Sequence, residues 1–99
     1  MEIAFQIADP MTMREDGSGF VTGRALLRIQ LGDILYASSA SGDSQESAYV
    51  VKGIEGYGRT FTYVRPPRVC GLILHGEHIE NLSNATHLCA ETSSDENMK

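Results

Sequence analysis

The sequence lacks the features that mark membrane and secreted proteins. No apolar run approaches the roughly 20 residues needed to span a bilayer. The first ten residues, MEIAFQIADP, carry an acid at position 2 and no basic segment, so they do not have the form of a signal peptide. We therefore expect a cytoplasmic protein with no membrane partner. In that compartment the only two cysteines, Cys70 and Cys89, would stay reduced.

Motifs for nucleotide binding and catalysis are also missing. The chain has no P-loop pattern GxxxxGK(S/T), so we expect no GTP binding of that kind. It contains no GxSxG, no HExxH and no pair of carboxylates arranged for catalysis. A nucleophilic pair of Cys70 and His75 would need an exposed thiol of low pKa, but Cys70 lies in the apolar run VCGLIL. We expect a protein that is not an enzyme and uses no cofactor.

Basic residues are too few for the charge balance of a typical nucleic-acid-binding domain. The net charge is −5, with 8 Lys and Arg against 13 Asp and Glu. Most of the excess lies in residues 77–99, so residues 1–76 are nearly neutral. Because nucleic-acid binders usually carry a basic excess, this balance disfavours RNA without excluding a local basic patch.

Histidine and cysteine are few but grouped near the C-terminal end. His75 and His78 form an H-x-x-H pair, and His87 and Cys89 form an H-x-C pair. Neutral imidazole and thiolate are zinc ligands, so a metal site is one interpretation of this group. The irregular spacing favours the other interpretation, in which these are ordinary surface residues, and we expect no metal.

What the sequence does contain is a set of short β-type segments between turn signals. Strands are expected over residues 3–8, 20–31, 34–38, 48–58, 59–64 and 69–76. Apolar and polar residues alternate from residue 20, after the hairpin signal Asp16-Gly17, and Gly32-Asp33 ends that strand. Gly23 interrupts the strand and indicates a bend or a close strand crossing. Short strands at this spacing predict an all-β sandwich or small barrel.

Four motifs in order carry a family resemblance. They are IADPMTM (7–13), GSGFVTGRALLRIQLGDIL (17–35), VKGIEGYGRTF (51–61) and VCGLILHGEHIENL (69–82). Together they resemble the second domain of translational GTPases such as elongation factor Tu. The resemblance implies a small closed six-stranded β-barrel, here a stand-alone domain over residues 1–82. We expect residues 83–99 to form a polar, acidic and flexible tail.

The resemblance implies less about the ligand. In the elongation factor, the stretch similar to IADPMTM helps to hold the aminoacylated end of tRNA with two acids and an aromatic residue. Asp9 matches one of these acids, whereas Ala8 and Met11 stand in place of the other acid and the aromatic residue. These departures weaken the prediction of a tRNA site at this stretch.

The segment RTFTYVRPPR is the candidate interaction site. Alternation places Arg59, Phe61, Tyr63 and Arg65 on one face of a strand, with Arg68 following the two prolines. Guanidinium groups beside aromatic rings could stack on single-stranded bases, and Arg24 and Arg28 could extend the patch. The other interpretation, which we favour, is that the aromatic residues pack in the core and the arginines line the rim.

The sequence therefore predicts a non-catalytic binding module. Its expected partner is a protein or a second copy of the chain, because the barrel is nearly neutral and has no catalytic set. The alternative is an RNA- or tRNA-binding barrel linked to translation.

Overall fold

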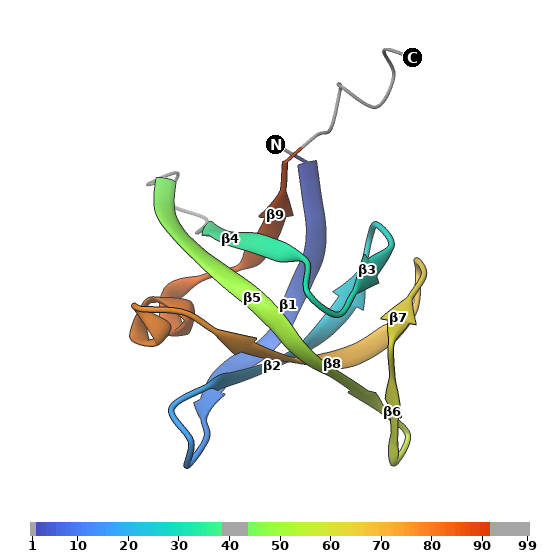
Figure 1. Cartoon of the computed structure of the whole chain (residues 1–99). Coiled ribbons are helices and arrows are strands. Elements are labelled where there is room, and N and C mark those ends of the chain that lie inside the picture. Colours follow the sequence, from blue (N-terminus) through green and yellow to red (C-terminus); the bar gives the residue numbers. More distant parts are fainter. Residues whose placement is uncertain (1, 39–43, 92–99) are drawn as a thin grey trace.

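The computed structural model describes residues 2–38 and 44–91 (Figure 1), and this part of the chain is all-β, as predicted. Its elements, in chain order, are the strands β1 (Glu2–Met13), β2 (Gly19–Ala25), β3 (Ile29–Gln30), β4 (Ile34–Ser38), β5 (Ser44–Gly56), β6 (Arg59–Phe61), β7 (Tyr63–Val64) and β8 (Val69–His75), then the 3-10 helix η1 (Ile79–Asn84) and strand β9 (His87–Ala90). None of the helical segments described is long and apolar enough to cross a membrane.

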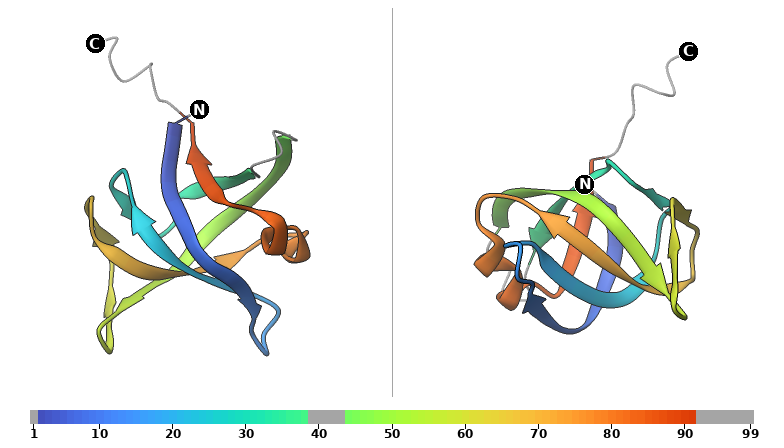
Figure 2. Two further views of the ribbon diagram at one scale, coloured as in Figure 1. Left: turned by 180° about the vertical axis from the view of Figure 1, so that it is seen from behind. Right: turned by 60° about the horizontal axis from the view of Figure 1, so that its bottom comes forward.

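Six antiparallel strands are joined in a closed ring. The pairings run β4–β9–β1–β2–β8–β5, and β5 pairs with β4 to complete the circuit (Figure 1). Figure 2 shows the same ring from behind and from below, with η1 at one side of it. The core fills the ring with apolar side chains from all six strands, the largest being Tyr49, Phe5, Leu35, Ile54, Leu72, Leu74 and Leu88.

The sixth strand of the ring is not the one that the sequence indicated. We expected a flexible tail from residue 83, but η1 continues to Asn84 and β9 pairs with both β1 and β4. Leu88 is fully buried opposite Phe5 on one side and Ala37 on the other. Residues 87–90 therefore close the ring, while residues 92–99 of the expected tail lie outside the described part.

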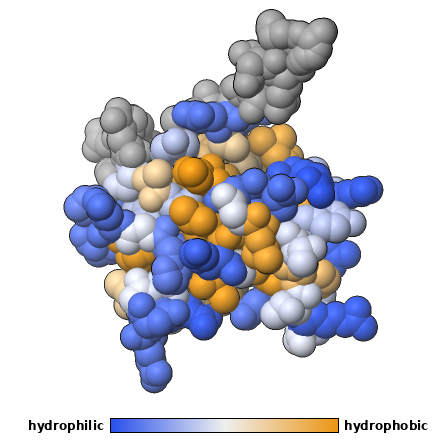
Figure 3. Space-filling view, viewed as in Figure 1, coloured by the Kyte–Doolittle hydropathy of each residue, from blue (hydrophilic) through white to orange (hydrophobic). Residues whose placement is uncertain are grey.

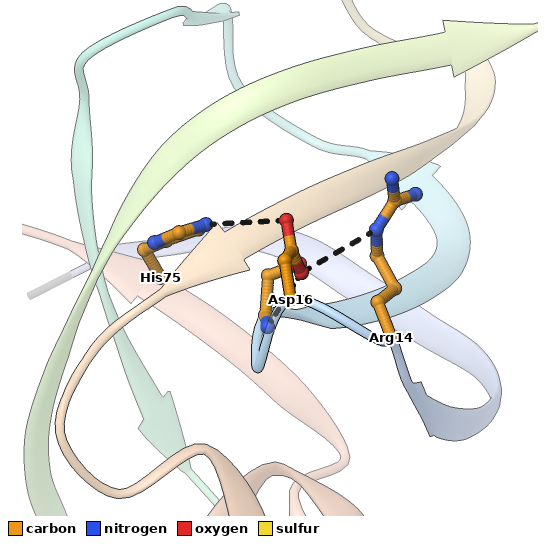
Figure 4. A network of polar contacts seen from close by, with 4 residues as sticks. Arg14, Asp16 and His75 are labelled. Carbon is orange, nitrogen blue, oxygen red and sulfur yellow. Dashed lines mark hydrogen bonds and ion pairs between the residues drawn. The ribbon is translucent and has the colours of Figure 1, made fainter.

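Strands β1 and β2 form the hairpin that Asp16-Gly17 predicted. Gly17 has a φ of 90°, and the Asp16 carboxylate accepts hydrogen bonds from the backbone N–H and the hydroxyl of Ser18. These bonds hold the pKa of Asp16 below its usual value. The same carboxylate lies 4.0 Å from both Arg14 Nε and His75 Nε2, so it ties the turn to the end of β8 (Figure 4).

Gly23 lies at a close crossing of β1 and β2, as its place in the strand predicted. A Cβ atom there would stand 1.9 Å from the carbonyl oxygen of Gln6, closer than any contact between non-bonded atoms. The predicted alternation holds through Val21, Gly23 and Ala25, which are all buried. The alternation continues through the partly buried Leu27 and the buried Ile29, although β2 itself ends at Ala25 and the chain pairs next as β3 with β7; it breaks at Leu31, which is exposed.

The segment 59–64 is not the single alternating strand that we predicted. Its first part, β6, pairs with β5, and its second part, β7, pairs with β3. The change of partner falls at Thr62, so the two parts face different neighbours. Phe61 packs against the core, and the next inward residue is Val64, three positions later, where strict alternation would require two or four. This corner lies outside the ring.

Candidate interaction surfaces

Arginine and aromatic side chains from three segments meet beside the corner between β6 and β7. The guanidinium carbon of Arg28 lies 4.7 Å from the ring centre of Tyr63, and that of Arg65 lies 5.8 Å from the same centre. Arg68 lies over the ring of Phe61 at 5.3 Å. Cation–π contacts of this kind contribute about 0.5–1 kcal/mol each at exposed sites, enough to orient a long side chain.

Arg24 joins the same group through the backbone. Its Nη1 donates a hydrogen bond of 2.9 Å to the carbonyl oxygen of Pro67. We define the arginine–aromatic surface by these six residues: Arg24, Arg28, Phe61, Tyr63, Arg65 and Arg68. An open hollow of about 550 Å³ runs along it, lined by residues 60–65 and Arg68. Five of these six residues are sequence-predicted site residues, and the sixth, Arg28, was considered only as an extension of the patch.

The arginine–aromatic surface gathers four arginines, Arg24, Arg28, Arg65 and Arg68. Among the side chains that the structure describes, ion pairs involve Arg14, His75 and His78, and none involves an arginine of this surface. The acidic residue Glu80 belongs to η1, which lies across the ring from β3 and β7 (Figures 1 and 2). An acid also lies near the surface, because the Asp33 carboxylate accepts a hydrogen bond from the backbone N–H of Gln30, which pairs with Tyr63.

The two remaining predicted site residues lie away from this surface. Asp9 is exposed on β1, and its carboxylate accepts a hydrogen bond of 2.8 Å from the Thr22 hydroxyl. Arg59 is at the far end of β6, where the β5–β6 hairpin turns. The corner at Thr62 thus divides the predicted face, with Arg59 and Phe61 on β6 before it and Tyr63 and Arg65 after it.

Sequence reasoning missed a second surface, which we call the outer groove. It is an open hollow of about 530 Å³ between the β5–β6 hairpin and the outer face of β2 and β8. The residues that line it are Phe20, Thr22, Glu55, Gly56, Tyr57, Gly58, Arg59, Thr60, Val69, Cys70 and Gly71. The floor is shallow because the Phe20 ring lies directly over Gly71, where a Cβ would stand 2.5 Å from it.

Tyr57 is the unusual residue of the outer groove. Its side chain is 83 % exposed at the tip of the β5–β6 hairpin, and its φ is 54°. Together with Gly58, at a φ of 75°, this gives a two-residue turn with two positive φ angles, a conformation that favours Asn-Gly and disfavours a bulky residue. The exposed ring therefore contributes little to the packing of the fold, and its backbone conformation is one that bulky residues rarely adopt. The corresponding sequence signal is the segment Gly56-Tyr57-Gly58, in which tyrosine occupies a turn position that favours asparagine.

The histidine and cysteine side chains do not form a common cluster. Within residues 2–38 and 44–91, no three His, Cys, Asp or Glu side chains converge as they would around a metal ion. His75 faces Asp16, His78 lies 3.7 Å from Glu80, and His87 lies beside Thr86. The thiol of Cys70 is buried, and burial raises its pKa, which suits a core residue rather than a nucleophile.

Comparison with known proteins finds no relative of this chain. No family model matches the chain, and no curated protein sequence matches it. The likeness to the translation-factor domain therefore rests on the sequence motifs.

Proposed function

We propose that this chain is a non-catalytic interaction module of the cytoplasm, built as a closed six-stranded barrel of the translation-factor domain-2 type. Three observations support the barrel. The strand pairings form a ring, Gly23 of the VTGR motif lies at a close crossing, and Gly32 has the positive φ that the GD turn requires. A closed ring of this kind leaves few free strand edges and supports side chains that face outward from rigid strands.

The partner in this proposal is a protein that docks in the outer groove. The observation that carries the proposal is the exposed aromatic ring of Tyr57 beside an open hollow, with Val69 also 46 % exposed. Tyrosine is enriched at protein interfaces because one rigid side chain supplies both a large apolar area and a hydroxyl group. Glu55 and Arg59 at the rim would add polar contacts that select the partner.

Replacing Tyr57 by asparagine tests this proposal without disturbing the hairpin. Asparagine accepts a positive φ, so the turn in Tyr57→Asn should form at least as well as in the original chain. Wild-type and variant protein are immobilised at equal density, and proteins captured from the native host are quantified by mass spectrometry. We expect the groove-dependent partner to fall by at least about tenfold, the effect of losing a central interface residue.

The matched control is Ile34→Asn. Ile34 is 50 % exposed on β4, and Figure 3 shows apolar side chains over β4 and β5 in the view of Figure 1. This substitution removes exposed apolar surface far from the outer groove and should leave the captured partner unchanged. Equal capture by wild type and Tyr57→Asn, or equal losses in both variants, would contradict docking in the groove.

RNA is the second candidate, and the arginine–aromatic surface favours it. Guanidinium groups held against rings present their N–H donors to phosphate, and the ring of Tyr63, which is 42 % exposed, offers a stacking surface for a base. The overall charge of −5 opposes long-range attraction of RNA, which is why this candidate ranks second.

A salt titration tests the second candidate. If single-stranded RNA binds at this surface, replacing Arg28, Arg65 and Arg68 together by glutamine should lower the salt slope of binding by about three units, one per phosphate contact. Fluorescence anisotropy of a labelled RNA measures the slope. The control is Arg14→Gln, which removes a positive charge at the β1–β2 turn and should leave the slope unchanged. Wild-type binding that is weak and independent of salt would exclude this candidate.

A further inference from the structure

Strand β6 has one edge without a neighbouring strand. It lies at the end of the sheet and pairs with β5 alone, and Figure 1 shows it outside the ring. An unpaired strand edge presents backbone N–H and C=O groups, and an extended segment of another protein can bind there as an added strand. The edge itself therefore specifies the conformation of a segment that completes it.

Thr60 is the residue whose backbone groups face this open edge. The two-residue turn makes Gly56 and Arg59 a hydrogen-bonded pair, and in an antiparallel ladder such pairs alternate with pairs whose N–H and C=O groups point outward. The next pair, Glu55 and Thr60, is of this second kind. The outward groups of Glu55 face β8, where Gly71 is its partner, whereas Thr60 is exposed and has no strand beside it.

The open edge borders the outer groove. Thr60 lines the groove and also the hollow of the arginine–aromatic surface. Beyond Thr60 the edge is closed, because the carbonyl oxygen of Thr62 accepts a hydrogen bond of 3.0 Å from the N–H of Leu31. A segment added beside Thr60 therefore extends toward the tip of the hairpin, along the outer groove, and leaves the corner at Thr62 uncovered.

The charge around this edge is positive. Arg59 lines the outer groove and Arg65 and Arg68 line the neighbouring hollow, whereas Glu55 is the only acid among the described residues that line either. Among the described side chains, none of these four forms an ion pair within the chain. Three bases against one acid, in a chain whose net charge is −5, favour a partner segment that is acidic.

From the open edge and its charge we infer that the docking protein binds through a short, extended, acidic segment that adds to β6 as a further strand. The N–H and C=O groups of Thr60 bond to the backbone of this segment. Its apolar side chains lie in the outer groove against Tyr57 and Val69, and its acidic side chains face Arg59 and Arg68. The inference rests on the proposed function, since it states which kind of segment occupies the groove.

Peptide display tests the composition of the segment. A library of random peptides of about ten residues, the upper length of common strands, is selected on the immobilised wild-type protein. We expect the selected peptides to be enriched in Asp and Glu, and this enrichment should disappear on the double variant Arg59→Gln/Arg68→Gln. The matched control is Arg14→Gln/Lys52→Gln, which removes two positive charges outside both hollows and should keep the enrichment.

Two substitutions at Thr60 separate its backbone from its side chain. Proline removes the N–H donor and is tolerated on edge strands, whereas valine keeps the N–H and removes only the hydroxyl group. The probe is the most enriched acidic peptide, labelled for fluorescence anisotropy. Its dissociation constant should rise at least about tenfold for Thr60→Pro, the effect of one net hydrogen bond, and stay within about twofold for Thr60→Val. Thermal unfolding shows whether each variant folds.

Amide hydrogen exchange follows the same N–H in the wild type and does not depend on the proline variant. The amide of Thr60 should exchange rapidly in the free protein, whereas that of Phe61, which is bonded to β5, is protected from the start. A saturating concentration of the acidic peptide should slow exchange at Thr60 at least about tenfold, because the N–H then has a partner.

The outcomes separate the inference from the proposal on which it rests. A selection that yields no peptide or peptides without an acidic excess, or a peptide that leaves exchange at Thr60 unchanged, overturns the inference. If Tyr57→Asn still reduces capture of the host partner, the groove remains a docking site and only the added acidic strand is wrong. If capture is also insensitive to Tyr57→Asn, both the inference and the proposed function fail.

Discussion

Replacing Gly23 by alanine is expected to lower the free energy of unfolding by about 3 kcal/mol or more. The added Cβ would stand 1.9 Å from the carbonyl oxygen of Gln6 and 2.9 Å from its carbonyl carbon. Both are backbone atoms of β1, so relief requires the two strands to separate, whereas a flexible side chain would turn aside. Overpacking in a core costs 1–3 kcal/mol even where side chains can adjust. Urea denaturation followed by circular dichroism measures the loss.

The control for this prediction is Gly56→Ala. The nearest atom to a Cβ at Gly56 is a ring carbon of Phe61 at 3.4 Å, which is an ordinary contact. The free energy of unfolding of Gly56→Ala should differ from that of the wild type by no more than about 1 kcal/mol, because alanine without a clash mainly restricts the unfolded chain. Equal unfolding midpoints for wild type and Gly23→Ala would mean that β1 and β2 do not cross closely at this residue.

Replacing Leu88 by alanine is the second large effect, with an expected loss of about 2–5 kcal/mol. Leu88 is fully buried in β9 between Phe5 and Ala37, so its truncation leaves a cavity at the closure of the ring. The matched control is Ile34→Ala, a half-exposed residue on the neighbouring strand β4, which should lose less than about 1 kcal/mol. Thermal or urea unfolding measures both variants.

This comparison decides whether residues 87–90 belong to the folded ring. If Leu88→Ala unfolds at the same urea concentration as the wild type, β9 contributes nothing to stability. The ring would then be open at that point, and the originally expected flexible tail from residue 83 would be correct.

Local signals in the sequence predicted the turns and the crossing strand. Asp16-Gly17 and Gly32-Asp33 encode their turns within a few residues, through positive φ at glycine and side-chain bonds to the backbone. The alternation at Val21, Gly23 and Ala25 indicated the inward face of β2 for the same reason. Such signals do not depend on which distant segment becomes the neighbour.

Features that depend on distant neighbours were missed. The four residues of β9 are too few to show a period of two, and its partners lie far away in the chain, β4 by about 50 residues and β1 by more than 80. The corner at Thr62 was missed because β7 pairs with β3, which no local pattern indicates.

The candidate surfaces were predictable to different degrees. The pattern of arginine and aromatic residues in 59–68 included Phe61, Tyr63, Arg65 and Arg68, whose side chains the structure brings together. In the structure Arg59 lies at the far end of β6, whereas Arg28, which precedes β3 in the chain, lies over the ring of Tyr63. The outer groove combines residues from β2, β5, β6 and β8, so its only local signal was a tyrosine in a turn that favours asparagine.

The most direct test of the central claim, that the outer groove is a docking surface for a protein partner, is two-dimensional NMR of backbone amides as the captured partner is added. The account predicts shifts at residues 55–60, at Phe20 and at residues 69–71, with residues 62–65 and η1 unchanged. Shifts confined to the arginine–aromatic surface or to β4, or no shifts at a saturating concentration of the partner, would contradict it.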